Sequence, residues 1–155
     1  MEGKVAVVAG ASSGVGRAIA RAFVAEGAKV ALLARGREGL EAAAAEIPEA
    51  LVLPLDVSDA EAVERAAQEV VRTWGGIDVW VNDAMVSVFS PISEMQPEEF
   101  RRVMEVNYLG YVHGTLSALR ATRPRNRGII LQIGSALPYR SIPLQSAYCA
   151  SKAAI

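Results

Sequence analysis

The chain alternates short apolar runs with longer alanine-rich segments in which apolar residues recur at helical spacing. Short runs without polar positions are typical of parallel strands, because helices cover both faces of a parallel sheet. We expect strands over residues 4–9, 29–33, 51–55, 78–81 and 128–133. The alternation predicts an α/β protein of the Rossmann type, a doubly wound parallel sheet with five strands in the order 3-2-1-4-5.

Helices are expected between these strands, over residues 14–26 and 38–46 and from Ser58 to the glycines at 75–76. Ser58 is the expected N-cap of the third, with an acidic residue three positions later. A long helix is expected to begin at Pro97. Its inward-facing stripe is predicted to consist of Phe100, Val103, Met104, Val106, Leu109, Val112, Leu116 and Leu119.

The 155 residues predict one domain, residues 1–155, since no linker or repeat interrupts the pattern. Sixteen basic residues against 17 acidic ones, scattered along the chain, disfavour a nucleic-acid partner. A single cysteine excludes an internal disulfide and a thiolate metal cluster, and no metal is expected. Neither a signal-peptide pattern nor an apolar run of about 20 residues is present, so we expect a cytoplasmic protein without a membrane partner.

A glycine-rich loop, AGASSGVG, joins the first strand to the first helix. Glycine lets the backbone approach a pyrophosphate closely, and the helix N-terminus offers free N–H groups to an anion. A turn selected only for tight packing is the alternative, which the surrounding βα units disfavour. The expected cofactor contacts in this loop are Gly10, Ser12, Ser13, Gly14, Val15 and Gly16.

The second strand ends in Arg35 rather than in the acidic residue that binds both ribose hydroxyls of NAD. Arginine suits a 2′-phosphate, so NADP is favoured over NAD; a solvated turn at Arg35 and Arg37 is the alternative. Asp56, followed by Val57, comes directly after the third strand. It could accept a hydrogen bond from an adenine amino group or simply precede the next helix, and both interpretations remain open.

Tyr148 and Lys152 are spaced four residues apart, which places them on one face of a helix. A neighbouring cation favours the phenolate, so the pair could form a usable acid/base. Ser135 follows the fifth strand, where its hydroxyl could hold a substrate oxygen. Cys149 is interpreted as a small buried residue within the tyrosine motif, and His113 as a structural residue because it has no carboxylate or serine partner at the spacing of a catalytic triad.

Taken together, these motifs resemble the short-chain dehydrogenase/reductase family in its single-domain branch, from Lys4 to Ile155. The resemblance implies hydride transfer between NADP(H) and a small-molecule carbonyl or secondary alcohol, with Tyr148 as general acid/base. Lys152 would lower the pKa of the tyrosine and bind the nicotinamide ribose, and Ser135 would position the reacting oxygen. Two further residues match the family: Asn82 on the cofactor side, and Asn107, which would hold a water in a proton relay.

The sequence departs from the family at Ala9, where threonine is usual, and at Asp83 and Met85, where asparagine and glycine are usual. The chain also ends three residues after Lys152, so we expect an incomplete domain. Its last strand would then be an open apolar edge, which favours a homo-oligomer. The alternative function is a catalytically inactive nucleotide-binding or oligomerising fragment that lacks the substrate site.

Overall fold

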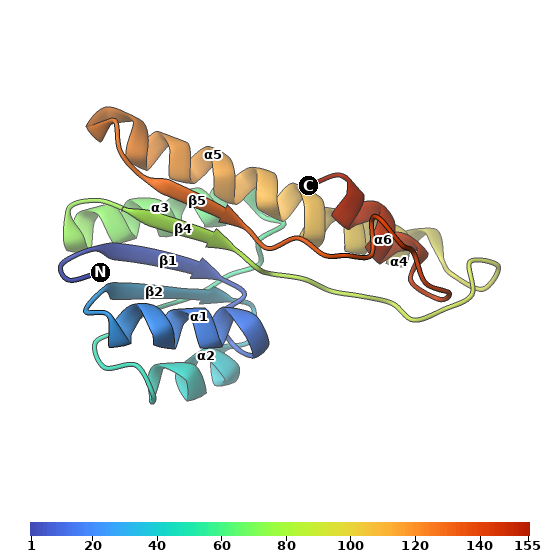
Figure 1. The fold of residues 1–155 in the computed structure, drawn as a ribbon, viewed down its shortest axis with the longest axis horizontal. Helices are drawn as coiled ribbons and strands as arrows, with labels where there is room; N and C mark the ends of the chain where they lie inside the picture. Colours follow the sequence, from blue (N-terminus) through green and yellow to red (C-terminus); the bar gives the residue numbers. More distant parts are fainter.

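Five short strands pair in parallel in one sheet, in the order 3-2-1-4-5. The computed structural model describes residues 1–155, and Figure 1 shows the helices that surround the sheet. The elements in chain order are β1 (Val5–Ala9), α1 (Gly14–Ala25), β2 (Lys29–Ala34), α2 (Arg37–Ala44), β3 (Leu51–Pro54), α3 (Ala60–Trp74), β4 (Val79–Asn82), α4 (Pro97–Met104), η1 (Glu105–Leu109), α5 (Gly110–Thr122), η2 (Arg123–Arg125), β5 (Ile129–Gln132) and α6 (Ser146–Ala153). The predicted fold class and strand order are confirmed.

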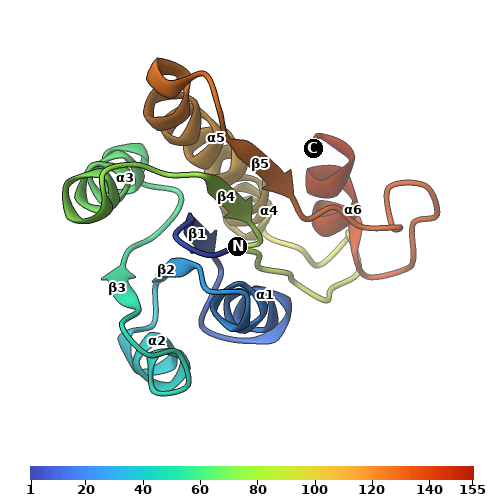
Figure 2. The same ribbon diagram turned by 60° about the vertical axis from the view of Figure 1, so that its left-hand side comes forward.

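Alternate residues of the central strands contribute side chains to two separate hydrophobic cores, one on each face of the sheet. Val7 faces the core on the α3 and α5 side of the sheet, and Val8 faces the core on the α1 and α2 side. Both side chains are fully buried. Figure 2 shows these two helical layers on opposite sides of the strands. Burial on both faces explains why the strands read as continuous apolar runs.

The strand order reverses between β1 and β4, which are neighbours in the sheet although two strands separate them in the chain. Loops that leave these two strands in opposite directions open a crevice at their carboxyl ends. In Figure 1, α4 and α6 lie beyond those same ends of the strands. The fold thus brings residues from the start and the end of the chain to one edge of the sheet.

The predicted stripe on the long helix is wrong in its second half. A five-residue π-helical turn, η1, separates α4 from α5, and Leu109, Leu116 and Leu119 are exposed. Small residues face the sheet instead, because a Cβ at Gly114 would collide with Asn82 and with Trp80 on β4. The buried residues of η1 and α5 are Val106, Asn107, Gly110, Tyr111, Gly114, Ser117, Ala118 and Thr122.

The N-cap of α3 is Asp59 and not the predicted Ser58. Asp59 has an extended backbone, and its carboxylate accepts a hydrogen bond from Ala62 N at 3.0 Å. Ser58 instead bonds to Asp56 through its N–H and its hydroxyl. Adjacent serine and aspartate are both good capping residues, so the cap depends on where the chain turns into the helix.

β5 forms one edge of the sheet and pairs only with β4. Its Ile129 and Leu131 side chains are 57% and 39% exposed. The predicted open apolar edge is therefore present among residues 1–155. None of the helices has the length and apolar character that a membrane crossing requires.

Candidate functional site

A cleft of about 780 Å³ lies at the carboxyl ends of the strands, beside the point where the strand order reverses. It brings the glycine-rich loop together with the tyrosine and lysine of α6, which are more than 130 positions away in the chain. Ten of the predicted site residues line it: Gly10, Ser12, Ser13, Gly14, Val15, Arg35, Asp56, Val57, Tyr148 and Lys152.

The loop after β1 has the geometry of a phosphate cradle. Gly10 has a φ of +94°, and a Cβ there would lie 2.7 Å from Ala84 N, so only glycine fits. Gly14 has a φ of +57° with open space around its Cα. Ser13, the N-cap of α1, makes no side-chain capping bond. The N-terminus of α1 therefore faces the cleft with donors available to an anion.

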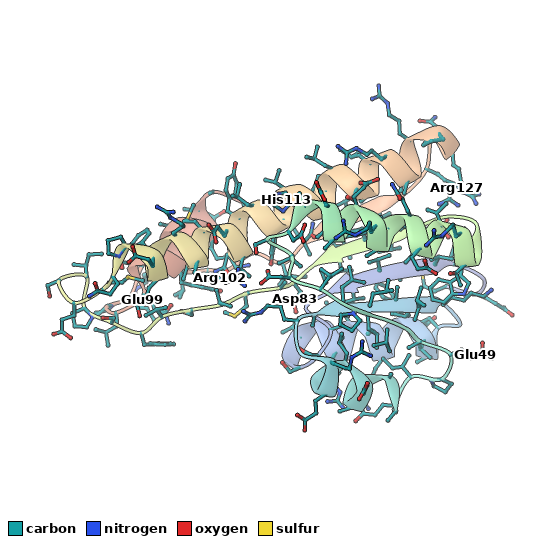
Figure 3. All side chains as sticks on the ribbon, turned by 180° about the vertical axis from the view of Figure 1, so that it is seen from behind. Glu49, Asp83, Glu99, Arg102, His113 and Arg127 are labelled. Atoms are coloured by element: carbon teal, nitrogen blue, oxygen red, sulfur yellow. The ribbon has the colours of Figure 1, made fainter.

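Asp83 lies beside this cradle, at the end of β4 (Figure 3). The Gly16 N–H donates to its carboxylate. Burial raises the pKa of the Asp83 carboxyl, although the Gly16 N–H and the charge of Lys152 act in the opposite direction. A negative group thus lies near the donors of α1, and Met85, 49% exposed, lines the cleft next to it.

Arg35 follows β2 at the rim of the cleft and is exposed. It takes part in no salt bridge, whereas Arg37 lies 3.7 Å from Glu41 and does not line the cleft. The two arginines therefore differ in their availability. Arg35 has its guanidinium free for an anionic ligand at the end of β2.

Asp56 lines the cleft with a carboxylate that the protein already uses. Ser58 donates to Oδ1, and Arg102 of α4 forms an ion pair with Oδ2. Burial alone would raise the pKa of Asp56, but the bonds from Ser58 and Arg102 outweigh it and hold the pKa below its ordinary value. His113 Nδ1 lies 2.9 Å from the Val57 carbonyl oxygen. Arg102 and His113, labelled in Figure 3, thus both anchor the loop after β3.

Tyr148 and Lys152 enter the cleft from successive turns of α6. Lys152 is buried, and its Nζ donates to the Ile133 carbonyl at 2.7 Å and to the Tyr111 hydroxyl at 2.8 Å. Burial lowers the pKa of Lys152 to about 8, although the charge of Asp83 acts to raise it. An ammonium with a pKa near neutrality can respond to a proton change in its neighbour.

Asn107 and Ser135 lie outside the lining of the cleft. The Asn107 amide is fully buried: its Oδ1 accepts from Val86 N at 2.8 Å, and its Nδ2 donates to Val86 O and Ser151 Oγ. It therefore ties η1 to the chain after β4 and to α6. Ser135 Oγ accepts from Leu137 N at 3.1 Å, and its own hydrogen has no acceptor in the protein.

Gly16 and Asn82 also do not line the cleft. A Cβ at Gly16 would collide with the Gly10 carbonyl oxygen, so this glycine lets the loop pack on α1. The buried Asn82 amide accepts from Trp80 Nε1 at 2.8 Å and donates to Gln132 Oε1 at 2.9 Å. Asn82 joins β4 to β5 behind the cleft.

One residue close to the site carries no motif and was absent from the sequence predictions. Tyr111 lies on the buried face of α5, four positions after Asn107, and contacts Lys152. The small residues Gly110 and Gly114 flank it on this face: Gly114 packs against β4, and Gly110 packs against Val57 in the loop after β3. The four-residue spacing of these glycines could have identified the buried face of α5 from the sequence. The leucines at helical spacing predicted a different face instead.

Residues 4–155 match the family model described as short chain dehydrogenase. The chain is 37% identical to sorbitol dehydrogenase from Cereibacter sphaeroides, over 100% of this chain and 61% of that protein. It is 33% identical to 3-oxoacyl-[acyl-carrier-protein] reductase from Haemophilus influenzae, over 100% of this chain and 64% of that one. The chain thus spans about 60% of the length of these two relatives.

Solved structures give the same picture. NAD⁺-bound xylitol dehydrogenase superimposes with a TM-score of 0.94 at 34% identity, over 99% of this chain and 61% of that one. The F189W actinorhodin polyketide ketoreductase with NADPH superimposes with a TM-score of 0.93 at 33% identity, over 97% and 60%. The neighbours therefore include proteins with either dinucleotide.

Proposed function

The chain belongs to the short-chain dehydrogenase family, and from this premise we propose that it supplies the dinucleotide site and the acid/base of an NADP(H)-dependent oxidoreductase. The substrate would be a small-molecule carbonyl or secondary alcohol. The observation that carries the proposal is that Tyr148 and Lys152 line the same cleft as the glycine-rich loop.

The residues of the cleft fit a dinucleotide. The loop from Gly10 to Val15 would hold the pyrophosphate at the N-terminus of α1, and the rim formed by Arg35 would hold the adenosine side. Gly16 and Asn82 would support this half from behind. When bound, the nicotinamide would supply the hydride chemistry, and the protein would orient it.

The proton chemistry would belong to α6. Tyr148 would give a proton to the substrate oxygen during reduction and take it back during oxidation. Lys152 would lie one helical turn from Tyr148 with its positive charge and bind the nicotinamide ribose. Ser135, with its free hydroxyl hydrogen, would bind the same substrate oxygen, and Asn107 would hold α6 in register with the chain after β4.

NADP is preferred over NAD in this proposal because Arg35 is exposed, unpaired and at the rim of the cleft. A 2′-phosphate would give its guanidinium a charged partner. Asp56 could bind the adenine amino group or simply precede the next helix. Because both of its carboxylate oxygens already accept hydrogen bonds from the protein, its main role would be to shape the adenine pocket.

The remaining partner proposal is a homo-oligomer, supported by the exposed apolar edge of β5. We also propose that residues 1–155 form one dinucleotide-binding unit, because the two cores share one sheet.

Fluorescence titration of the chain with NADPH and with NADH tests the cofactor proposal. We expect tighter binding of NADPH; equal affinities would overturn the assignment of Arg35. Reduction of a panel of ketones with NADPH tests the reaction. Binding of NADPH without turnover of any of them would favour the inactive nucleotide-binding alternative for these residues.

A further inference from the structure

Lys152 is held by a second tyrosine that lies on a different helix from Tyr148. Its Nζ donates to the Tyr111 hydroxyl at 2.8 Å, and the same hydroxyl donates to the Ile133 carbonyl at 3.0 Å. Lys152 Nζ also donates to that carbonyl, at 2.7 Å. The ammonium, the phenol and the carbonyl therefore form a closed triangle at the end of β5.

The triangle fixes the direction in which the ammonium can act. An ammonium has three N–H donors, and this arrangement uses two of them. The Tyr111 side chain is almost fully buried, and the centre of its ring lies 4.5 Å from Nζ. One N–H remains available to the cleft that Tyr148 lines.

We infer that Tyr111 is a positioning residue for the acid/base pair: its hydroxyl holds the Lys152 ammonium at the cleft and favours its charged form. This inference rests on the proposed function, since it concerns how that lysine serves Tyr148. Tyr111 would act only through Lys152.

The surroundings keep the two tyrosines in different roles. Burial, followed by the charges of Asp83 and Tyr148, raises the pKa of Tyr111 above its ordinary value. Tyr111 therefore remains a neutral phenol that donates to Ile133 and accepts from Lys152. Facing the lysine are Tyr111 from α5 and Asp83 after β4, while Tyr148 from its own helix acts on Tyr111. Asp83 and the Tyr111 hydroxyl both favour the ammonium, against the effect of burial.

Tyr111→Phe tests the inference, because it keeps the ring and removes only the hydroxyl. The chain has three lysines, and the other two, Lys4 and Lys29, are exposed. Carbon-13 labelling at lysine Cε would therefore follow Lys152 individually by NMR. We expect its titration midpoint to fall by about one pH unit, the equivalent of one hydrogen bond to a charged group. Tyr139→Phe, at a phenol that is 94% exposed, is the matched control and should leave the midpoint unchanged.

An unchanged Lys152 midpoint in folded Tyr111→Phe would overturn the inference. If that variant does not fold, the wild-type chain labelled with carbon-13 at tyrosine Cζ provides the test. The chemical shift of Tyr111 Cζ should change with pH at the Lys152 titration midpoint. A Tyr111 shift that does not change at that midpoint would also overturn the inference.

Turnover gives an independent readout in the same variant. Loss of the hydroxyl should lower kcat at alkaline pH more than at pH 6 and leave KM for the dinucleotide nearly unchanged. Equal losses at both pH values would contradict the positioning role. The NMR titration needs no turnover, so failure of the proposed function would appear separately, as absent NADPH binding or absent ketone reduction with the Lys152 shift intact.

Discussion

The two halves of the cleft satisfy their polar groups in opposite ways. On the glycine-loop side, Ser13 leaves α1 without a side-chain cap, and Arg35 has no ion-pair partner. On the α6 side, protein groups already engage Lys152, Asn107 and Ser151. Unpaired donors gain from a ligand, whereas paired groups are preorganised before one arrives. This difference is what the proposed function requires, with an anion bound by the first half and a proton donor held in place by the second.

The largest expected effect is on the α6 side. Tyr148→Phe should lower kcat by at least about 10²-fold, the usual range for loss of a general acid/base. The Kd for NADPH should change little, because the loop side provides most of the donors. Stopped-flow turnover and fluorescence titration of the same variant measure the two quantities. Turnover equal to wild type would contradict the proton-transfer role, and a large loss of affinity would show that the halves are not separate.

Arg35→Ala should weaken NADPH binding by about 10- to 100-fold, as expected for a lost hydrogen bond to a charged group of about 1.5–3 kcal/mol. NADH binding should be nearly unchanged, because it has no 2′-phosphate. Arg37→Ala is the matched control: this arginine is also exposed but is paired with Glu41 outside the cleft. Equal losses for both dinucleotides in Arg35→Ala would indicate a nonspecific charge effect.

The loop side could be predicted from sequence because its requirements are local. Position 10 requires a positive φ and has no room for a Cβ, so it must be glycine. A requirement of this kind can be recognised from a few consecutive residues. The α6 pair was visible for the same reason, through its i,i+4 spacing. Tyr111 depends instead on which face of α5 meets the sheet, and that face is decided by Gly114 against Trp80 and Asn82. Hydrophobicity alone pointed to Leu116, which is exposed.

Asp83 lies where the two halves meet, since Gly16 N donates to it and its charge acts on Lys152. Its pKa is raised, so the carboxylate form dominates only above that raised value and there opposes an anionic pyrophosphate. Affinity for NADH should therefore rise as pH falls through the Asp83 pKa.

In Asp83→Asn this pH dependence should disappear, and affinity at pH 8 should be about fivefold higher, the effect of roughly 1 kcal/mol. Isothermal titration calorimetry at several pH values measures both changes. The asparagine variant also serves as the control for any titration of the dinucleotide itself, because that titration would be present in both proteins. An identical pH dependence of affinity in both proteins would show that Asp83 does not act on the bound dinucleotide.

The stability of the unliganded chain, where Ser13→Ala should have the smallest effect of all, gives the most direct test of the contrast between free and engaged groups. Ser13→Ala removes a hydroxyl without a capping bond, so the unfolding free energy of the unliganded chain should change by less than about 0.5 kcal/mol, as for an ordinary surface substitution. Ser151→Ala removes a buried hydroxyl that accepts from Asn107 and donates to the Tyr148 carbonyl, which should cost about 1–3 kcal/mol. Urea unfolding measures both.

With NADPH at saturation, the difference between the two losses of unfolding free energy should become smaller. Only Ser13→Ala then loses a ligand contact, and with it part of the stabilisation that binding provides. A Ser13→Ala penalty as large as that of Ser151→Ala in the unliganded chain would mean that the loop is already satisfied by protein groups, and the two halves would then not differ in kind.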